Sequence, residues 1–273
     1  FGYLKPGDKI QLLGGVIDIG KVWNGSSELV TYSAGVEGNP IVLESAPGVS
    51  SSINMTGGRF YISHDYWLIR NLKFTPTSSI VFTISSNHVN IEDNEFEPSW
   101  SVFRTASGVD HPARDINFRR NIVWLSGTNN VEMTSFRGYQ SVIEHNEFHY
   151  IGNTDGSMLF KGSAEDVEVR YNKFIVHPGV TSTGPAIFLG GDFPNIPDSL
   201  ISTWFTAVNI RVHDNLFYNF NNNLGHLQGT LLFGNAKDCS VYNNIFYLRN
   251  GGVTVENIGF YGLDKPPVNC TLK

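Results

Sequence analysis

The chain has 273 residues, of which 41% are hydrophobic and 16% charged, with 28 glycines and a formal net charge of −6. This length is enough to bury one large core, and low charge with abundant glycine excludes a helical bundle or a disordered chain. An acidic chain lacks the basic surface that neutralises phosphates, so we expect no nucleic-acid partner. No apolar run reaches the roughly 18–20 residues that cross a bilayer, so we expect no membrane partner either.

The predicted elements begin with a first coil and continue with a repeat. Residues 4–15 (LKPGDKIQLLGG) are typical of a turn, a strand and a glycine turn, and residues 39–48 (NPIVLESAPG) of a strand that ends in a turn. One pattern then recurs: apolar, x, apolar, x, x, Asn, x, aromatic or apolar. Its copies occupy residues 89–96, 116–123, 141–148, 167–174, 210–217 and 239–246, with a looser copy at 66–74.

The repeat spacing predicts the architecture. Most neighbouring repeat asparagines lie about 25 residues apart, and the apolar positions alternate as they do in strands. Copies stacked at about 4.8 Å satisfy one another's backbone and form a continuous interior. We therefore predict an all-β fold, a single-stranded right-handed parallel β-helix of about 25 residues per coil, forming one domain over residues 1–273. The repeat asparagines are Asn71, Asn94, Asn121, Asn146, Asn172, Asn215 and Asn244.

These asparagines are expected to be structural. An asparagine in a tight bend tolerates a left-handed backbone and can bond its counterpart one turn away. The aromatic residues of the repeat are expected to stack in the core. They are Phe96, Phe148, Phe174, Phe217 and Phe246.

Each turn divides into a repeat copy, a variable loop and a further strand that leads to the next copy. Loops on a rigid coil are where binding surfaces normally lie, and residues 190–205 form one extra excursion. We call each of these further strands a first strand, because it leads into the next repeat copy. They are predicted at residues 80–85, 102–106, 131–136, 158–163, 186–189 and 230–235.

The segments KPGDKIQLLGG and NPIVLESAPG, with the motifs IRNLKF, IEDNEF and VRYNKF, resemble the parallel β-helix polysaccharide lyases. The resemblance is strongest to the alginate lyase and chondroitinase B group, polysaccharide lyase family six. It implies a secreted, extracellular enzyme that cleaves an acidic uronate polysaccharide by β-elimination. Alginate is the first expectation and pectate the second, and a related β-helix lyase family stays open. We expect a monomer.

Residues 157–174 (SMLFKGSAEDVEVRYNKF) are similar to the family segment in which a strand carries the catalytic lysine. The resemblance implies that Lys161 is the base that removes the C5 proton of a uronic acid. The family also places an acidic pair before this lysine to hold calcium. Here residues 153–157 offer only Asp155, so no cofactor is predicted as required and calcium stays open. The family's arginine on the next turn has no counterpart in residues 186–191.

β-Elimination also needs a positive group for the carboxylate and an acid for the leaving oxygen. Arg104 and Arg137 lie on or at the end of the two preceding first strands and are predicted to bind the carboxylate and lower the pKa of Lys161. Three acids stay open: Tyr139 in the bend after a strand, and Tyr150 and His177 in loops expected to flank Lys161.

The remaining candidates concern substrate binding. Glu132, on a first strand, is predicted to bind a cation or tune Arg104, and Trp124, near a loop, to stack on a sugar ring. Asp155 is also predicted to bind the substrate.

Two other function classes stay open. A glycoside hydrolase needs clustered carboxylates, for which Asp155, Asp192 and Glu132 are the plausible set. A non-catalytic glycan-binding coil needs none. A disulfide between Cys239 and Cys270 also stays open.

Overall fold

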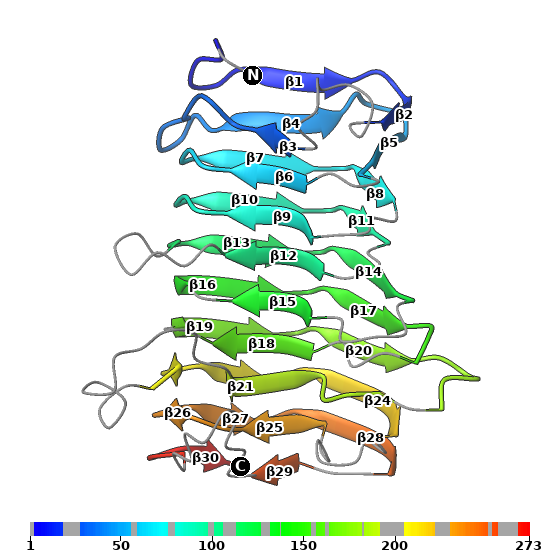
Figure 1. The fold of residues 1–273 in the computed structure, drawn as a ribbon, viewed down its shortest axis with the longest axis vertical. Helices are drawn as coiled ribbons and strands as arrows, with labels where there is room; N and C mark the ends of the chain where they lie inside the picture. Colours follow the sequence, from blue (N-terminus) through cyan, green and yellow to red (C-terminus); the bar gives the residue numbers. More distant parts are fainter. Residues whose placement is uncertain are drawn as a thin grey trace.

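The computed structural model is a stack of short strands that coil from the N-terminal to the C-terminal end (Figure 1). It describes residues 3–18, 28–55, 59–75, 80–97, 101–105, 113–126, 132–136, 138–153, 157–161, 164–181, 183–191, 205–221, 230–250, 253–255 and 267–273. Within these ranges, no helix is long and apolar enough to cross a membrane.

Three sheets run along the coil, and the pairs of strands within each of them are parallel. Sheet A contains β1 (Lys9–Leu12), β4 (Ile41–Ser45), β7 (Trp67–Arg70), β10 (Val89–Glu92), β13 (Ile116–Arg119), β16 (Tyr139–Glu144), β19 (Ala164–Arg170), β23 (Arg211–His213), β27 (Ser240–Tyr242) and β30 (Thr271–Leu272), with β22 (Ala207–Val208) and β26 (Ala236–Lys237) paired beside them.

The other two sheets complete each turn. Sheet B contains β2 (Gly15–Asp18), β5 (Ser51–Asn54), β8 (Lys73–Thr75), β11 (Glu95–Phe96), β14 (Ile122–Leu125), β17 (Glu147–Tyr150), β20 (Lys173–Val176), β24 (Leu216–Asn221) and β28 (Ile245–Asn250). Sheet C contains β3 (Glu28–Val30), β6 (Arg59–Ile62), β9 (Ile80–Ile84), β12 (Ser101–Thr105), β15 (Glu132–Phe136), β18 (Ser157–Lys161), β21 (Ile187–Gly191), β25 (Leu231–Phe233) and β29 (Val253–Val255).

The predicted parallel β-helix is confirmed. The chain crosses sheets A, B and C in turn, so that the repeat copies supply sheets A and B and the predicted first strands supply sheet C. Alternate residues of each strand enter the interior: Ile91 and Phe118 are neighbours in register and both fully buried. Each such side chain contributes about 1.5–3 kcal/mol by leaving water.

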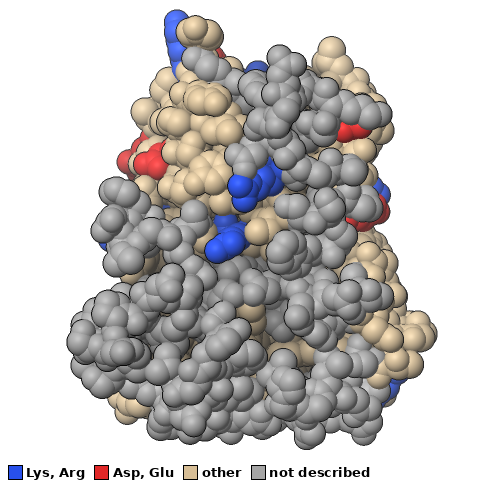
Figure 2. Space-filling model, viewed as in Figure 1, with Lys and Arg blue, Asp and Glu red and all other residues tan. Residues whose placement is uncertain are grey.

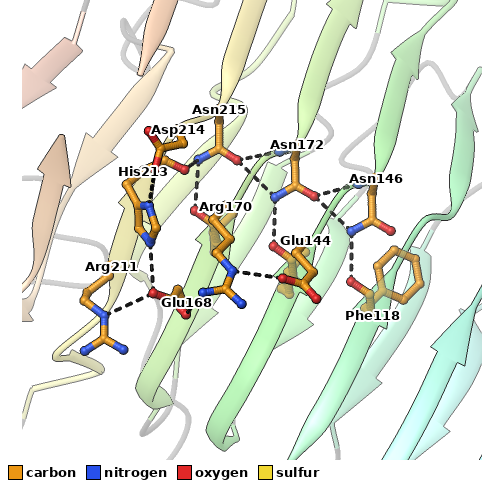
Figure 3. Close-up of polar contacts among 12 residues, drawn as sticks. Phe118, Glu144, Asn146, Glu168, Arg170, Asn172, Arg211, His213, Asp214 and Asn215 are labelled. Carbon is orange, nitrogen blue, oxygen red and sulfur yellow. Dashed lines mark hydrogen bonds and ion pairs between the residues drawn. The ribbon is translucent and has the colours of Figure 1, made fainter. Parts of the chain in front are cut away.

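The buried asparagines form a ladder along the bend between sheets A and B. The side-chain oxygen of Asn146 accepts from the backbone N–H of Asn121 at 2.9 Å, and its amide donates to the carbonyl of Phe118 at 2.9 Å. Asn172 and Asn215 repeat this arrangement on the following turns (Figure 3). The structural role predicted for these asparagines is therefore confirmed.

Two details of that prediction are wrong. The left-handed backbone belongs to the residue before each ladder asparagine, such as Arg120 (φ 53) before Asn121, because the bend needs that conformation where the side chain faces solvent. Asn71 (φ 55) belongs to this exposed column and not to the ladder. The backbone N–H of Leu72 bonds Asn94 Oδ1 at 3.0 Å, so the copy at 66–74 is shifted by one residue.

The predicted aromatic stack is confirmed over most of its length. Phe148, Phe174, Phe217 and Phe246 stack at centroid distances of 4.9, 4.9 and 4.7 Å. Phe96 stacks on Phe74 of the preceding turn at 5.1 Å.

Candidate functional site

The outer face of sheet A is neutralised by its own side chains. Acidic and basic residues alternate along one register column, so that each arginine meets a carboxylate of the adjacent turn. Arg119 Nε lies 2.8 Å from Glu92 and Arg170 Nε 2.9 Å from Glu144, the latter pair drawn in Figure 3. A face whose positive charges are already paired is a poor place to bind an acidic polymer.

Sheet C, in contrast, presents an exposed arginine that is not paired in this way. Arg104 is exposed, while its neighbours Phe103 and Thr105 are fully buried, so Arg104 points outward from the coil. Within the described part of the chain, no carboxylate forms an ion pair with Arg104. In register, Arg104 pairs with Thr83 on one side and Ser135 on the other. Figure 2 shows Lys and Arg atoms near the centre of this face.

The starts of three successive turns of sheet A line up at one corner between sheets C and A, which we call the C–A corner. The residues there are Arg114, which precedes β13, Tyr139, which begins β16 rather than lying in a bend, and Glu165 of β19. Arg114 and Tyr139 are partners in an isolated parallel bridge, and Tyr139 pairs in register with Glu165. Lys161 ends β18 and therefore lies at the same corner, three residues before the start of β19 at Ala164. The side chain of Lys161 and the whole of Arg137 lie outside the described residues.

Tyr139 is the acid candidate that lies at the C–A corner, where β18 ends at Lys161. Its half-buried ring lies under the guanidinium of Arg114, whose Cζ is 5.7 Å from the ring centroid. Burial raises the pKa of Tyr139, and the negative charge of Glu165 adds to this, whereas Arg114 opposes it. The phenol therefore keeps its proton at neutral pH. Sequence reasoning missed Arg114, whose one signal was its place just before the repeat copy at 116–123.

The expectation for Tyr150 is wrong. Tyr150 lies in β17 rather than in a loop, and its side chain is fully buried. Its ring packs edge-on against Phe220 at 5.2 Å, and burial raises its pKa. Its hydroxyl has no hydrogen-bond partner among the described residues. The period-2 alternation of β17 places Tyr150 inside the coil beside Phe148, so it cannot contact a substrate.

Trp124 and His177 lie on the outer face of sheet B. Trp124 belongs to β14 rather than a loop, its ring stacks on His149 at 4.3 Å, and its Nε1 donates to Glu95 at 3.1 Å. His177 follows β20, and its Nε2 lies 2.9 Å from His149 Nδ1. Burial lowers the pKa of His149.

The prediction that His177 flanks Lys161 is wrong. The bend from sheet B to sheet C leads to the first residue of β18, Ser157, whereas Lys161 is its last residue. At about 3.3 Å per residue, the strand separates these ends by about 13 Å. Glu132 opens β15 opposite Ser157, at the same end as His177. The side chain of Glu132 and the whole of Asp155 lie outside the described residues, as does Asp192.

The stretch where the resembled family holds calcium, residues 153–157, lies partly outside the described residues. Among the described side chains, no three His, Cys, Asp or Glu converge where a metal ion could be held. Residues 153–157 contain a single carboxylate where the family has a pair. We therefore derive no step through calcium.

No protein-family model and no curated protein matches the sequence. Among solved structures, the chain is similar to an alginate lyase from Paenibacillus sp. str. FPU-7, with a TM-score of 0.57 and 16% identity over 91% of this chain and 93% of that one. It is also similar to the pectate lyase Pel9A, with a TM-score of 0.50 and 14% identity over 93% of this chain and 70% of that one. The chain therefore has the fold of the parallel β-helix polysaccharide lyases, as the sequence predicted.

Proposed function

We propose that the protein is a polysaccharide lyase that cleaves an acidic, uronate-containing polysaccharide, with alginate as the favoured substrate. The observation that carries the proposal is the positive charge on sheet C. Arg104 is exposed and makes no ion pair with a described carboxylate, and the next turns bring Arg114, Tyr139 and the end of Lys161's strand to the adjacent corner. The fold shared with an alginate lyase and a pectate lyase supports this reading.

The proposed roles follow from the chemistry of β-elimination. Lys161 takes the C5 proton, and the electron pair of that C–H bond forms the C4–C5 double bond while the C4–O bond breaks. Arg104 and Arg137 stabilise the substrate carboxylate as negative charge develops on it. Tyr139 gives its proton to the leaving oxygen. We expect arginine charges near Lys161 to lower its pKa and so favour its neutral form.

The proposal extends to the setting of the enzyme. Acidic polysaccharides of this kind are extracellular polymers, so we propose that the protein is secreted. We also propose that it acts as a monomer. The negative net charge does not oppose binding, because a local basic strip is sufficient to attract an acidic polymer.

The test is incubation of the protein with alginate, pectate and chondroitin while following the ultraviolet absorbance of the unsaturated product. Alginate is expected to give the strongest signal. Lys161→Ala is expected to abolish it, whereas the matched surface variant Lys237→Ala on sheet A is expected to retain it. Absence of product with every uronide would overturn the proposal, and reducing ends without unsaturation would favour a glycoside hydrolase.

A further inference from the structure

The outer face of sheet B carries a histidine pair that the proposed lyase chemistry does not use. His149 lies in β17 and is 9% exposed, while His177 follows β20 on the next turn and is partly exposed. His149 Nδ1 and His177 Nε2 face one another at 2.9 Å. The ring of Trp124 covers one face of His149 and is itself fixed by its bond to Glu95.

A carboxylate orients the buried member of the pair. Glu147 Oε2 lies 3.3 Å from His149 Nε2, and Glu147 Oε1 is held by Lys173 Nζ at 2.8 Å. A carboxylate accepts hydrogen bonds only, so the proton of neutral His149 resides on Nε2 and the lone pair of Nδ1 points toward His177. Metal-binding histidines are usually held in this way, with a carboxylate on the ring nitrogen that does not bind the metal.

The spacing of the two nitrogens suits a particular coordination angle. Metal–imidazole bonds are about 2.0–2.1 Å long. With the two nitrogens 2.9 Å apart, a metal bonded to both would have an N–metal–N angle of about 90°. This is the cis angle of square-planar and octahedral complexes, which Cu²⁺ and Ni²⁺ favour over the tetrahedral geometry of Zn²⁺.

We propose that His149 and His177 form a binding site for a divalent transition metal, with Cu²⁺ bound most tightly and Glu147 acting as the orienting carboxylate. In the metal-free protein, His177 Nε2–H donates to the Nδ1 lone pair of His149. To bind a metal, the more exposed His177 takes the tautomer that is protonated on Nδ1, and its ring tilts about Nε2 so that both lone pairs meet at the metal while the two nitrogens keep their spacing. No third His, Cys, Asp or Glu among the described residues converges on this point. In the proposed complex, water completes the coordination. Bound metal would link two adjacent turns of the coil.

The experiment is a titration of tag-free protein with Cu²⁺ alone, followed by calorimetry and by electron paramagnetic resonance. The wild type is expected to bind one equivalent with a spectrum split by two imidazole nitrogens. His177→Gln is expected to lower the affinity at least tenfold and remove one nitrogen from the spectrum. Glu147→Gln keeps both ligands but loosens His149, and is expected to weaken binding about 10–100-fold.

A matched control separates this site from adventitious binding. His88 is a partly exposed histidine paired with Asp115 at 2.8 Å on sheet A's side of the coil, and His88→Gln is expected to leave the affinity and the spectrum unchanged. His149→Gln gives a second test, with circular dichroism confirming that the nearly buried position still folds. Absence of a bound equivalent in the wild type, or equal affinity in wild type and His177→Gln, would overturn the proposal.

Discussion

Substitution of Asn146 by leucine tests whether the asparagine ladder holds the coil together. Asn146 is fully buried and has bonds on both sides. Its oxygen accepts from the backbone N–H of Asn121 at 2.9 Å, and its amide donates to the carbonyl of Phe118 at 2.9 Å and to Asn172 Oδ1 at 2.9 Å. Leucine has a similar volume but supplies none of these groups.

The magnitude follows from what the substitution leaves unpaired. Asn172 Oδ1 keeps its bond from the backbone N–H of residue 146 at 3.0 Å, and the side-chain amide of Asn121 keeps its bond to the carbonyl of Ile91 at 2.9 Å. The backbone N–H of Asn121 and the bend-facing lone pair of the Phe118 carbonyl lose their partner inside the coil. Each such loss costs about 1–3 kcal/mol, so we expect a loss of about 2–6 kcal/mol.

The assay is equilibrium unfolding in urea at 25 °C. Typical stabilities are about 5–15 kcal/mol, so the midpoint should fall by a large and measurable amount. Asn244→Leu is the matched control, because Asn244 stands at the last observed rung and is partly exposed to water. Its cost should be clearly smaller. A loss below about 1 kcal/mol for Asn146→Leu, or equal losses at both positions, would refute the reasoning.

Three further predictions address single side chains. Tyr139→Phe is expected to lower kcat by about 100-fold or more in the lyase assay with little change in KM, because it removes a proton donor and leaves the ring; an unchanged kcat would exclude Tyr139 as the acid. Tyr150→Phe is expected to raise the free energy of unfolding by about 1–2 kcal/mol, because the buried hydroxyl of Tyr150 lacks a hydrogen-bond partner among the described residues. A loss of stability in urea unfolding would show that the hydroxyl does form a hydrogen bond. A hydrogen bond from Cys239 lowers the pKa of Cys270 to about 7, so the alkylation rate of Cys270 should rise with pH around that value. Alkylation of Cys239 should stay slow, because this cysteine is buried. A midpoint of the Cys270 rate profile at the ordinary cysteine pKa of about 8.5 would contradict this prediction.

The repeat pattern predicted most of the fold. A strand buries every second residue, and each ladder asparagine must recur once per turn to bond its counterpart, so both periods are visible in the one-dimensional sequence. The error at Asn71 shows the limit of this reading. Two adjacent positions of the bend both favour asparagine, one for its buried amide and the other for its left-handed backbone, and the pattern does not separate them.

The structure places two of the candidate site residues, while their roles stay predictions. Arg104 points outward from sheet C, and Tyr139 lies at the corner where β18 ends at Lys161. Arg114 was missed, because it meets Tyr139 only where separate turns of the coil stack. Tyr150 was misplaced, because a loop and the end of a strand look alike in sequence.

The sequence by itself determined the period of the coil, its buried ladder and the faces of its strands, because these depend on regularities that repeat along the chain. Only the tertiary structure decided which ends of the strands share a corner. It separated Lys161 from His177 and joined His177 to His149, 28 residues away in sequence. Such neighbours depend on where each turn bends back across the stack, and variable loops of unequal length set that position without leaving a periodic signal.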